Sequence, residues 1–291
     1  MSLSRGVLVE GYQTTAGDQG TRPVINAGSQ AVGQIVSTPS PGSNVIGSVV
    51  SNIEVNGTNT ATTGINVGGN YDAMAKNCVS KNCTTYGFIG GICVNCHAES
   101  SPRGYLVHSN YFCTATLCSF AGFSSNANGA AFVNCISYGN TGRGFFVDRV
   151  YTRYINCVAY NNSLDGFSSN SDSQHHIRCI TAENGGYGIR STNANSDEFT
   201  LDTADYNNVS GRTIGTNTRK DIRPITLTAD PFVDAANLDF RINDVAGGGA
   251  ELRQIQLSGL TGVNGVFDIG AIDAVVTAGG GGAVLHPLRS N

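Results

Sequence analysis

Cysteine recurs along this chain at near-constant intervals, and this repeat limits the folds that the chain can adopt. Each member before Leu201 lies eight to ten residues before a glycine that is followed by an aromatic or aliphatic residue. Successive members are 23, 18, 17, 22, 22, 22 and 22 residues apart. A fixed period of this length indicates a solenoid, in which each repeat is one structural unit. The series is Val55, Cys78, Cys96, Cys113, Cys135, Cys157, Cys179 and Leu201.

A second series follows the first in every repeat. It pairs a glycine with a large apolar residue, and asparagine-rich turns such as residues 160–162 lie between the two series. Around the cysteines, apolar and polar residues alternate as in a β-strand, so that Val133, Cys135 and Ser137 are expected on one inward face. Ile155 and Ile177 are expected to follow Val133 in the same way. Each repeat therefore indicates one coil of short parallel strands, stacked about 4.8 Å from the next. The large residues are Ile65, Phe88, Tyr105, Phe123, Phe145, Phe167 and Ile189.

The composition agrees with an all-β chain and excludes other classes. Glycine makes up 38 of 291 residues and charged residues only 13%, so helix-forming residues do not dominate. A net charge of −4 lacks the basic balance that nucleic-acid binding needs. No apolar run approaches the ~18 residues of a membrane span. The first residues do not form a secretion signal. We therefore expect no nucleic-acid partner, no membrane partner and no visible signal peptide.

The repeat also explains most of the nine cysteines. Six of them are expected to form an inward column, in which a buried thiol behaves as a small apolar side chain. Stacked neighbours have parallel Cβ vectors that fit disulfide geometry poorly, so we expect free thiols. Cys83, Cys93 and Cys118 lie outside the column. The column comprises Cys78, Cys96, Cys113, Cys135, Cys157 and Cys179.

The string from Cys93 to His97 matches the Cys-x-x-Cys-His pattern of haem attachment. Alternation along a strand points Cys96 inward and His97 outward, which argues against a haem. A zinc site would need a fourth ligand and a different backbone. We therefore expect no metal and no cofactor.

The pattern Asn-Cys-x-x-x-x-Asn followed by Gly-Phe resembles the right-handed parallel β-helix repeat proteins of the pectate-lyase-like superfamily. Residues 11–20 resemble an early turn of bacterial and phage members. Residues 230–242 and 267–271 resemble the closing segment of choice-of-anchor Q-type proteins. The resemblance covers about residues 7–273. It implies an all-β fold with a parallel β-helix over residues 1–222, a closing segment over 223–275 and a glycine-hinged extended tail over 276–291.

The two ends of the chain predict contacts with other molecules. Relatives usually carry further N-terminal coils, so we expect a neighbouring subunit to cover the first coil here. After four glycines at 279–282 the chain ends in an apolar segment, which is either a frayed terminus or an arm that docks on a neighbour. The docking residues would be Val284, Leu285, Pro287 and Leu288. We expect a homo-oligomer, of which a trimer is one form, or a complex with another virion or assembly protein.

Candidate catalytic residues are few. The chain lacks the active-site motifs of pectate lyases and polygalacturonases, in particular an Asp-Asp pair followed by His-Gly and Arg-x-Lys. The densest polar region lies between Arg143 and His176. We expect a solvated face there, with Arg143 and Asp165 stacked one coil apart as an ion pair. The alternative is a catalytic groove, for which the candidates are Asp148, Asp165, Asp172 and His175.

The sequence therefore favours a non-catalytic structural protein of a larger assembly. The expected role is that of a phage virion decoration, capsid-associated or tail protein, located in a virion or an extracellular assembly. The alternative is a carbohydrate-binding or polysaccharide-degrading β-helix, such as a tailspike depolymerase or a lyase. In that case Tyr138, Tyr154 and Tyr160 would stack on sugar rings. Tyr138 and Tyr160 share one position in the coil, so a structural ladder explains them equally well. The superfamily includes lyases, hydrolases, epimerases, adhesins and viral fibres, so the fold alone does not decide between these functions.

Overall fold

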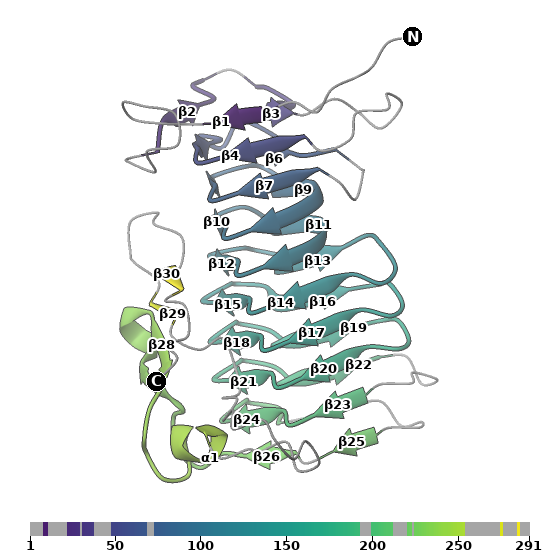
Figure 1. Ribbon diagram of the computed structural model, residues 1–291, viewed down its shortest axis with the longest axis vertical. Coiled ribbons are helices and arrows are strands. Elements are labelled where there is room, and N and C mark those ends of the chain that lie inside the picture. The colour runs from purple at the N-terminus through teal and green to yellow at the C-terminus, as the bar shows by residue number, and fades with distance from the viewer. Residues whose placement is uncertain are drawn as a thin grey trace, which may run out of the picture.

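The computed structural model describes residues 8–10, 22–29, 31–37, 48–68, 73–192, 199–211, 220–222, 224–253, 274–275 and 284–285. Within these residues the chain winds into a parallel β-helix whose coils stack in sequence order (Figure 1). Every strand pair along the stack is parallel and in register with the coil before it, as in Val133 beside Ile155. The all-β solenoid that the repeat predicts is therefore confirmed.

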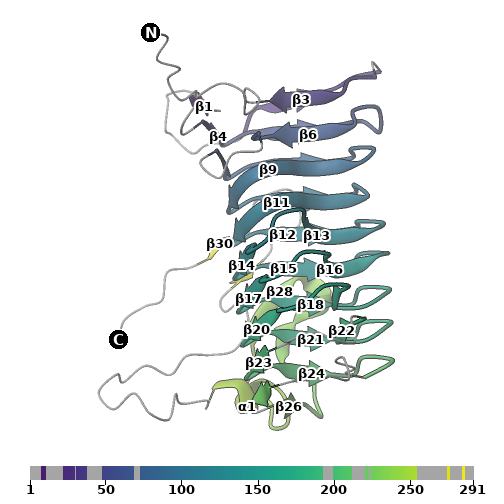
Figure 2. The same cartoon turned by 90° about the vertical axis from the view of Figure 1, so that its right-hand side faces the viewer.

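One wall of the helix is a 16-stranded sheet, counted over the described residues, with two arms (Figure 2). The long strands β9 (Tyr86–Val94) and β11 (Arg103–Tyr111) run through both arms. The first arm also contains β1 (Leu8–Glu10), β4 (Val49–Ser51), β7 (Met74–Lys76), β14 (Ala131–Val133), β17 (Arg153–Ile155), β20 (His175–Ile177), β23 (Phe199–Leu201) and β25 (Lys220–Ile222). The second arm also contains β3 (Gln34–Ser37), β6 (Thr63–Asn66), β13 (Ala121–Ser125), β16 (Arg143–Val147), β19 (Phe167–Ser169) and β22 (Ile189–Ser191).

The corner between the two arms explains the unequal repeat lengths. Coils that contain β13, β16 or β19 carry a five-residue loop at this corner, at residues 126–130, 148–152 and 170–174. In β9 and β11 the strand continues through the corner without a loop. The cysteine intervals of 17 and 22 residues therefore differ by one corner loop.

The opposite wall is a 10-stranded sheet within the described residues. Its central residues point inward, and the residues on either side of them form two outward rows. Its strands are β2 (Val24–Asn26), β5 (Glu54–Asn56), β8 (Val79–Lys81), β10 (His97–Glu99), β12 (Thr114–Thr116), β15 (Ile136–Tyr138), β18 (Val158–Tyr160), β21 (Ile180–Ala182), β24 (Ala204–Tyr206) and β26 (Ile225–Thr226).

The six column cysteines lie inside the bend that joins the first arm to the 10-stranded sheet. The residue before each cysteine has a left-handed backbone, as in Asn134 with φ 53°. Asparagine tolerates this conformation better than most residues, which explains its frequency there. The thiol of Cys135 donates a weak hydrogen bond to the Asn110 carbonyl of the preceding coil, 3.5 Å away. Cys157 does the same to Phe132 at 3.3 Å, so these thiols add side-chain contacts to the backbone of the preceding coil.

The left-handed residue corrects two details of the expected pattern. It shifts the alternation by one, so that Phe132, not Val133, points into the core. The same shift places Tyr154 and His176 inside, in place of Ile155 and Ile177. The two ends of the expected column are also out of register, because Val55 pairs with Ser80 and Leu201 pairs with Ile177. The residues in register with the cysteines are Ile53 and Thr203.

Glycine followed by an aromatic residue marks the turn into the second arm. A Cβ atom on Gly144 would lie 2.5 Å from the carbonyl oxygen of Gly166 in the next coil, so a side chain does not fit there. The aromatic residue after each glycine points into the core, where neighbouring rings stack with centroids 4.6–4.9 Å apart. This geometry adds aromatic stacking to the burial of apolar surface. The stacked rings are Phe88, Tyr105, Phe123, Phe145 and Phe167.

A column of asparagines lines the turn between the 10-stranded sheet and the second arm. Asn140 donates its side-chain amide to Asn162 at 2.7 Å, and Asn184 donates to Asn208 at 2.8 Å in the same way. Each side-chain oxygen also accepts the backbone N–H of the asparagine one coil earlier, as Asn184 does from Asn162. Buried polar groups that satisfy one another in this way fix the register of the coils.

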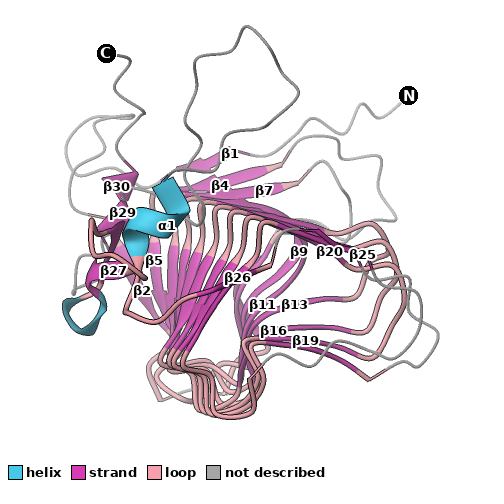
Figure 3. Cartoon of the chain, turned by 90° about the horizontal axis from the view of Figure 1, so that it is seen from below, coloured by secondary structure: helices cyan, strands magenta, loops and turns pink. Residues whose placement is uncertain are grey.

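The C-terminal part of the described chain folds back over the outer face of the 10-stranded sheet (Figures 1 and 3). It forms an antiparallel closing sheet and a short helix. Phe240 packs its ring against Tyr138 and Tyr160, which belong to β15 and β18. The elements are β27 (Phe232–Asp234), the 3₁₀-helix η1 (Ala235–Asn237), β28 (Asp239–Ile242), α1 (Gly249–Arg253), β29 (Ala274–Val275) and β30 (Val284–Leu285).

The helix α1 spans five residues, and among the described residues no helix has the length and apolar character that crossing a bilayer requires.

Candidate functional site

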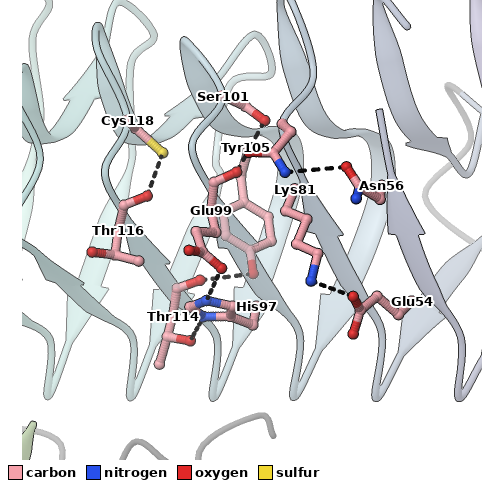
Figure 4. A network of polar contacts seen from close by, with 11 residues as sticks. Glu54, Asn56, Lys81, His97, Glu99, Ser101, Tyr105, Thr114, Thr116 and Cys118 are labelled. Atoms are coloured by element: carbon pink, nitrogen blue, oxygen red, sulfur yellow. Dashed lines mark hydrogen bonds and ion pairs between the residues drawn. The ribbon is translucent and has the colours of Figure 1, made fainter. Parts of the chain in front are cut away.

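A polar network on the outer face of the 10-stranded sheet brings together titratable groups that the sequence alone does not predict to be neighbours (Figure 4). Its centre is His97 on β10, whose Nδ1 shares a hydrogen bond of 2.6 Å with the hydroxyl of Thr114 on β12. The Nε2 atom of His97 lies 3.8 Å from a carboxylate oxygen of Glu99. The parallel register sets this arrangement, because His97 lies directly beside Thr114.

The network continues towards the N-terminal coils. Lys81 on β8 forms an ion pair with Glu54 on β5. Lys81 also lies in register with Glu99, so acidic and basic side chains alternate along this face. Asn82 donates its side-chain amide to Asn56 at 3.1 Å at the edge of the same cluster. Opposite charges on adjacent strands stabilise the pairing of a sheet by a modest amount.

A hydroxyl that contacts an imidazole, which in turn contacts a carboxylate, has the components of an activated nucleophile. Thr114, however, is only 1% exposed, so a substrate cannot approach its hydroxyl in this arrangement. The histidine side chain lowers the pKa of Glu99 below its ordinary value, because His97 hydrogen-bonds to the charged carboxylate. The contacts of this network run from coil to coil, and the geometry favours a structural link over a reactive centre.

Asp165, the first catalytic candidate from the sequence, lies at the start of the second arm. Its carboxylate is 3.9 Å from Arg143 in the preceding coil and 3.5 Å from Arg190 in the following one. It also accepts the backbone N–H of Tyr187 at 3.1 Å. Only 4% of Asp165 is exposed, so the carboxylate links three coils from a buried position. The structure thus places Arg143 beside Asp165, as the stacking argument expects.

Two of the other three candidates lie in loops at the corner between the arms, and the third begins a strand of the first arm. Asp148 follows β16, is exposed and accepts a hydrogen bond of 3.0 Å from Asn170. His175 begins β20 and contacts Phe199 with ring centroids 5.6 Å apart and the ring planes tilted by 60°. Burial lowers the pKa of His175, with smaller contributions from Arg153 and His176. Asp172 lies in the corner loop, where Gln174 donates to its backbone carbonyl at 3.0 Å. Across the described ranges, no three His, Cys, Asp or Glu side chains gather in a way that could hold a metal ion.

The haem-like string does not converge on one point. Cys93 and Cys96 point into the core, whereas His97 lies on the outer face against Thr114. All nine thiols of the chain are free and buried. Burial raises the pKa of the Cys118 thiol to about 12, which removes the thiolate needed for nucleophilic chemistry at neutral pH.

The tyrosines that the sequence offers for sugar stacking are covered within the chain, and Tyr138 lies directly beside Tyr160 as in a structural ladder. Tyr154 points into the core, where its ring stacks on His176. Tyr138 and Tyr160 lie on the outer face of the 10-stranded sheet under Phe232 and Phe240 of the closing sheet. Burial raises the pKa of Tyr138 to about 12. None of the three rings forms an open platform for a sugar.

The predicted docking arm lies at the limit of what the structure describes. Val284 and Leu285 form β30, whose backbone pairs antiparallel with β29 of the same chain. Pro287 and Leu288 lie outside the described residues. Docking on a neighbouring molecule therefore stays a prediction.

No family model matches the sequence, and no curated protein matches it either. The crystal structure of pectate lyase Pel9A is similar to this chain, with 13% sequence identity and a TM-score of 0.49. The match covers 94% of this chain and 97% of that one.

Proposed function

We propose that this chain is a non-catalytic structural component of a larger assembly, in which the β-helix serves as a rigid rod. The observation that carries the proposal is the direction of the contacts made by the candidate site residues. Asp165 binds Arg143 and Arg190 in the two neighbouring coils, and Asp148 binds Asn170 one coil away. Contacts of this kind hold coils together and leave the carboxylates engaged.

The closing sheet supports the same proposal. It covers the outward tyrosines of β15 and β18 with Phe232 and Phe240, so the chain itself covers this part of the sheet face. Covering an apolar part of a sheet face with its own chain is consistent with a part whose task is to keep its shape.

The enzymatic alternative is tested with the full chain and a panel of acidic polysaccharides. We expect no release of unsaturated or reducing ends. Asp165→Asn is expected to lower the urea midpoint of unfolding, because it weakens two ion pairs. Asp148→Asn, at an exposed carboxylate, is the matched control and is expected to change the midpoint less. Cleavage by the wild type that Asp165→Asn or His175→Ala abolishes in a folded protein would overturn the proposal.

The assembly is tested separately by sedimentation velocity and by electron microscopy of the native particle. The proposal includes the virion role, as a decoration, capsid-associated or tail protein, and we expect a multimer whose association weakens when residues 279–291 are removed. A monomer that is unaffected by this truncation would contradict the assembly role.

A further inference from the structure

The outer surface of the second arm carries arginines that lie over aromatic rings, and one of these arginines has no ion pair with a neighbouring coil. We define the arginine–aromatic face as Arg103, Phe120, Arg143 and Phe146, together with Tyr86. Arg103 lies in register with Tyr86 on one side and with Ala121 on the other, and Ala121 is followed by Arg143. Tyr86 lies on β9, Arg103 on β11, and Arg143 and Phe146 on β16, whereas Phe120 directly precedes β13. These four strands lie side by side (Figure 2).

Phe120 is the centre of this face. The guanidinium carbon of Arg103 lies 4.2 Å from its ring centroid, and that of Arg143 lies 5.8 Å from it. The two cations are therefore at most about 10 Å apart. Phe146 meets Phe120 edge-on, with centroids 5.3 Å apart, and Arg143 covers the face of Phe146 at 4.8 Å. Such contacts hold each guanidinium in a fixed orientation and leave its N–H edges free to donate.

The charges of the two arginines are balanced differently. Arg143 lies near the carboxylate of Asp165, which Arg190 also approaches. No carboxylate within the described residues forms an ion pair with Arg103, whose guanidinium lies over the rings of Phe120 and Tyr86. A positive site thus persists on a chain whose net charge is −4.

We propose that the arginine–aromatic face is a docking site for a carboxylate-bearing segment of a protein partner, a proposal that rests on the structural function given above. Charge complementarity identifies the partner group as an anion that accepts two or more N–H bonds. Two features favour a protein over a sugar. The ring faces of Phe120 and Phe146 are covered by guanidinium groups, and the half-buried Ile89 and Leu106 on the same surface add an apolar contact area. Arginine next to aromatic rings is the composition of energetic centres in protein interfaces.

The test measures binding of a fluorescein-labelled deca-glutamate peptide to the full chain by fluorescence anisotropy at low salt. A deca-glutamine peptide is the neutral control, and an oligogalacturonate of similar length is the competing glycan. We expect the acidic peptide to bind and the neutral one not to bind. Arg103→Ala should raise Kd about tenfold, because one charge-assisted contact is lost.

Two further variants separate this site from general electrostatics. Arg103→Lys keeps the charge but loses the planar stack, so its Kd should lie between those of the wild type and Arg103→Ala. Arg153→Ala removes the same charge from the exposed side of the first arm and should leave Kd unchanged. Circular dichroism of each variant checks that the coil stack is intact.

Three results would overturn the proposal. They are no binding of the acidic peptide by the wild type, equal losses in Arg103→Ala and Arg153→Ala, and preferential binding of the oligogalacturonate at Arg103. The last result would identify a glycan as the partner. None of them affects the cleavage assay with Asp165→Asn, so failure of this site and failure of the structural role are distinguishable.

Discussion

The side-chain amide of Asn162 donates a hydrogen bond to the side-chain oxygen of Asn184 in the next coil, 2.9 Å away. The same oxygen accepts the backbone N–H of Asn162 at 3.1 Å. Both residues are buried, so water cannot replace either partner. One asparagine therefore satisfies backbone and side chain of its neighbour at once, which ties the turns of successive coils together.

Asn162→Ala should lower the free energy of unfolding by about 2–4 kcal/mol, because it removes the buried acceptor of the Asn140 backbone N–H and side-chain amide and the buried side-chain donor to the Asn184 oxygen. Urea denaturation measures the change. Ser163→Ala, at the exposed neighbouring position, is the control and should change stability by less than about 0.5 kcal/mol. Equal effects of the two variants would contradict the role of the asparagine column.

Cys135→Asp should prevent folding, because it places a carboxylate inside the cysteine column, where a buried unpaired charge costs several kcal/mol. The expected result is insoluble protein on expression. Val133→Asp, two residues away and half-buried on the outer side, should remain soluble. A soluble Cys135→Asp variant with normal melting would show that the cysteine faces outward.

The native thiols should resist alkylation. Cys118 is fully buried and its pKa is raised to about 12, so almost no thiolate is present at pH 8. Intact-mass spectrometry after treatment with iodoacetamide should show little modification of the native chain and nine additions after unfolding in guanidinium. Rapid modification of the folded protein at Cys118 would contradict the burial of this side chain.

Glu99 should contribute to the loss of folding stability at low pH. Its folded-state pKa lies below the ordinary value of 4.5 because of His97, so its contribution to stability is present above about pH 4.5. This contribution is lost as the pH falls through the lowered pKa. Glu99→Gln should therefore lose less stability than the wild type between pH 5 and pH 3, measured by urea denaturation at each pH. Parallel curves for the two proteins would contradict the link to His97.

Phe240→Ala should destabilise the closing sheet, because the fully buried ring contacts Tyr138, Tyr160 and Phe232. Loss of such a ring costs about 3–5 kcal/mol. Hydrogen exchange should become faster in β15 and β18, which lie under the ring. Val233→Ala, at a position that is 49% exposed, is the control and should leave exchange in these strands unchanged.

The repeat in the sequence predicts the architecture because stacking places like residues above like residues. The positions of Phe88, Tyr105 and Phe123 follow directly from their common distance to a glycine. The interval of 22 residues between Asn140 and Asn162 agrees with the asparagine column, but a composition rich in asparagine predicts only a turn and not the hydrogen bonds between coils.

Other features depend on information that the local sequence does not carry. Strict alternation predicts Val133 in the core. The left-handed residue Asn134 reverses the alternation, so that Phe132 is buried instead. The cover over Tyr138 comes from Phe240, about a hundred residues later, and the link between His97 and Thr114 depends on the register between two coils. An alignment of the coils on the left-handed residue before each cysteine would have placed His97 beside Thr114 and Lys81 beside Glu99, and so would have predicted this charged network.

The corner between the two arms has no loop in β9 and β11 and five residues in the coils of β13, β16 and β19, while the strands on both sides keep their register. Length at this corner is thus uncoupled from the stacking of the helix. A peptide grafted between Asn128 and Gly129 would extend an existing protrusion without disturbing the walls. Grafts in neighbouring coils would then be displayed about 4.8 Å apart, so the choice of coil would set the distance between two grafted peptides.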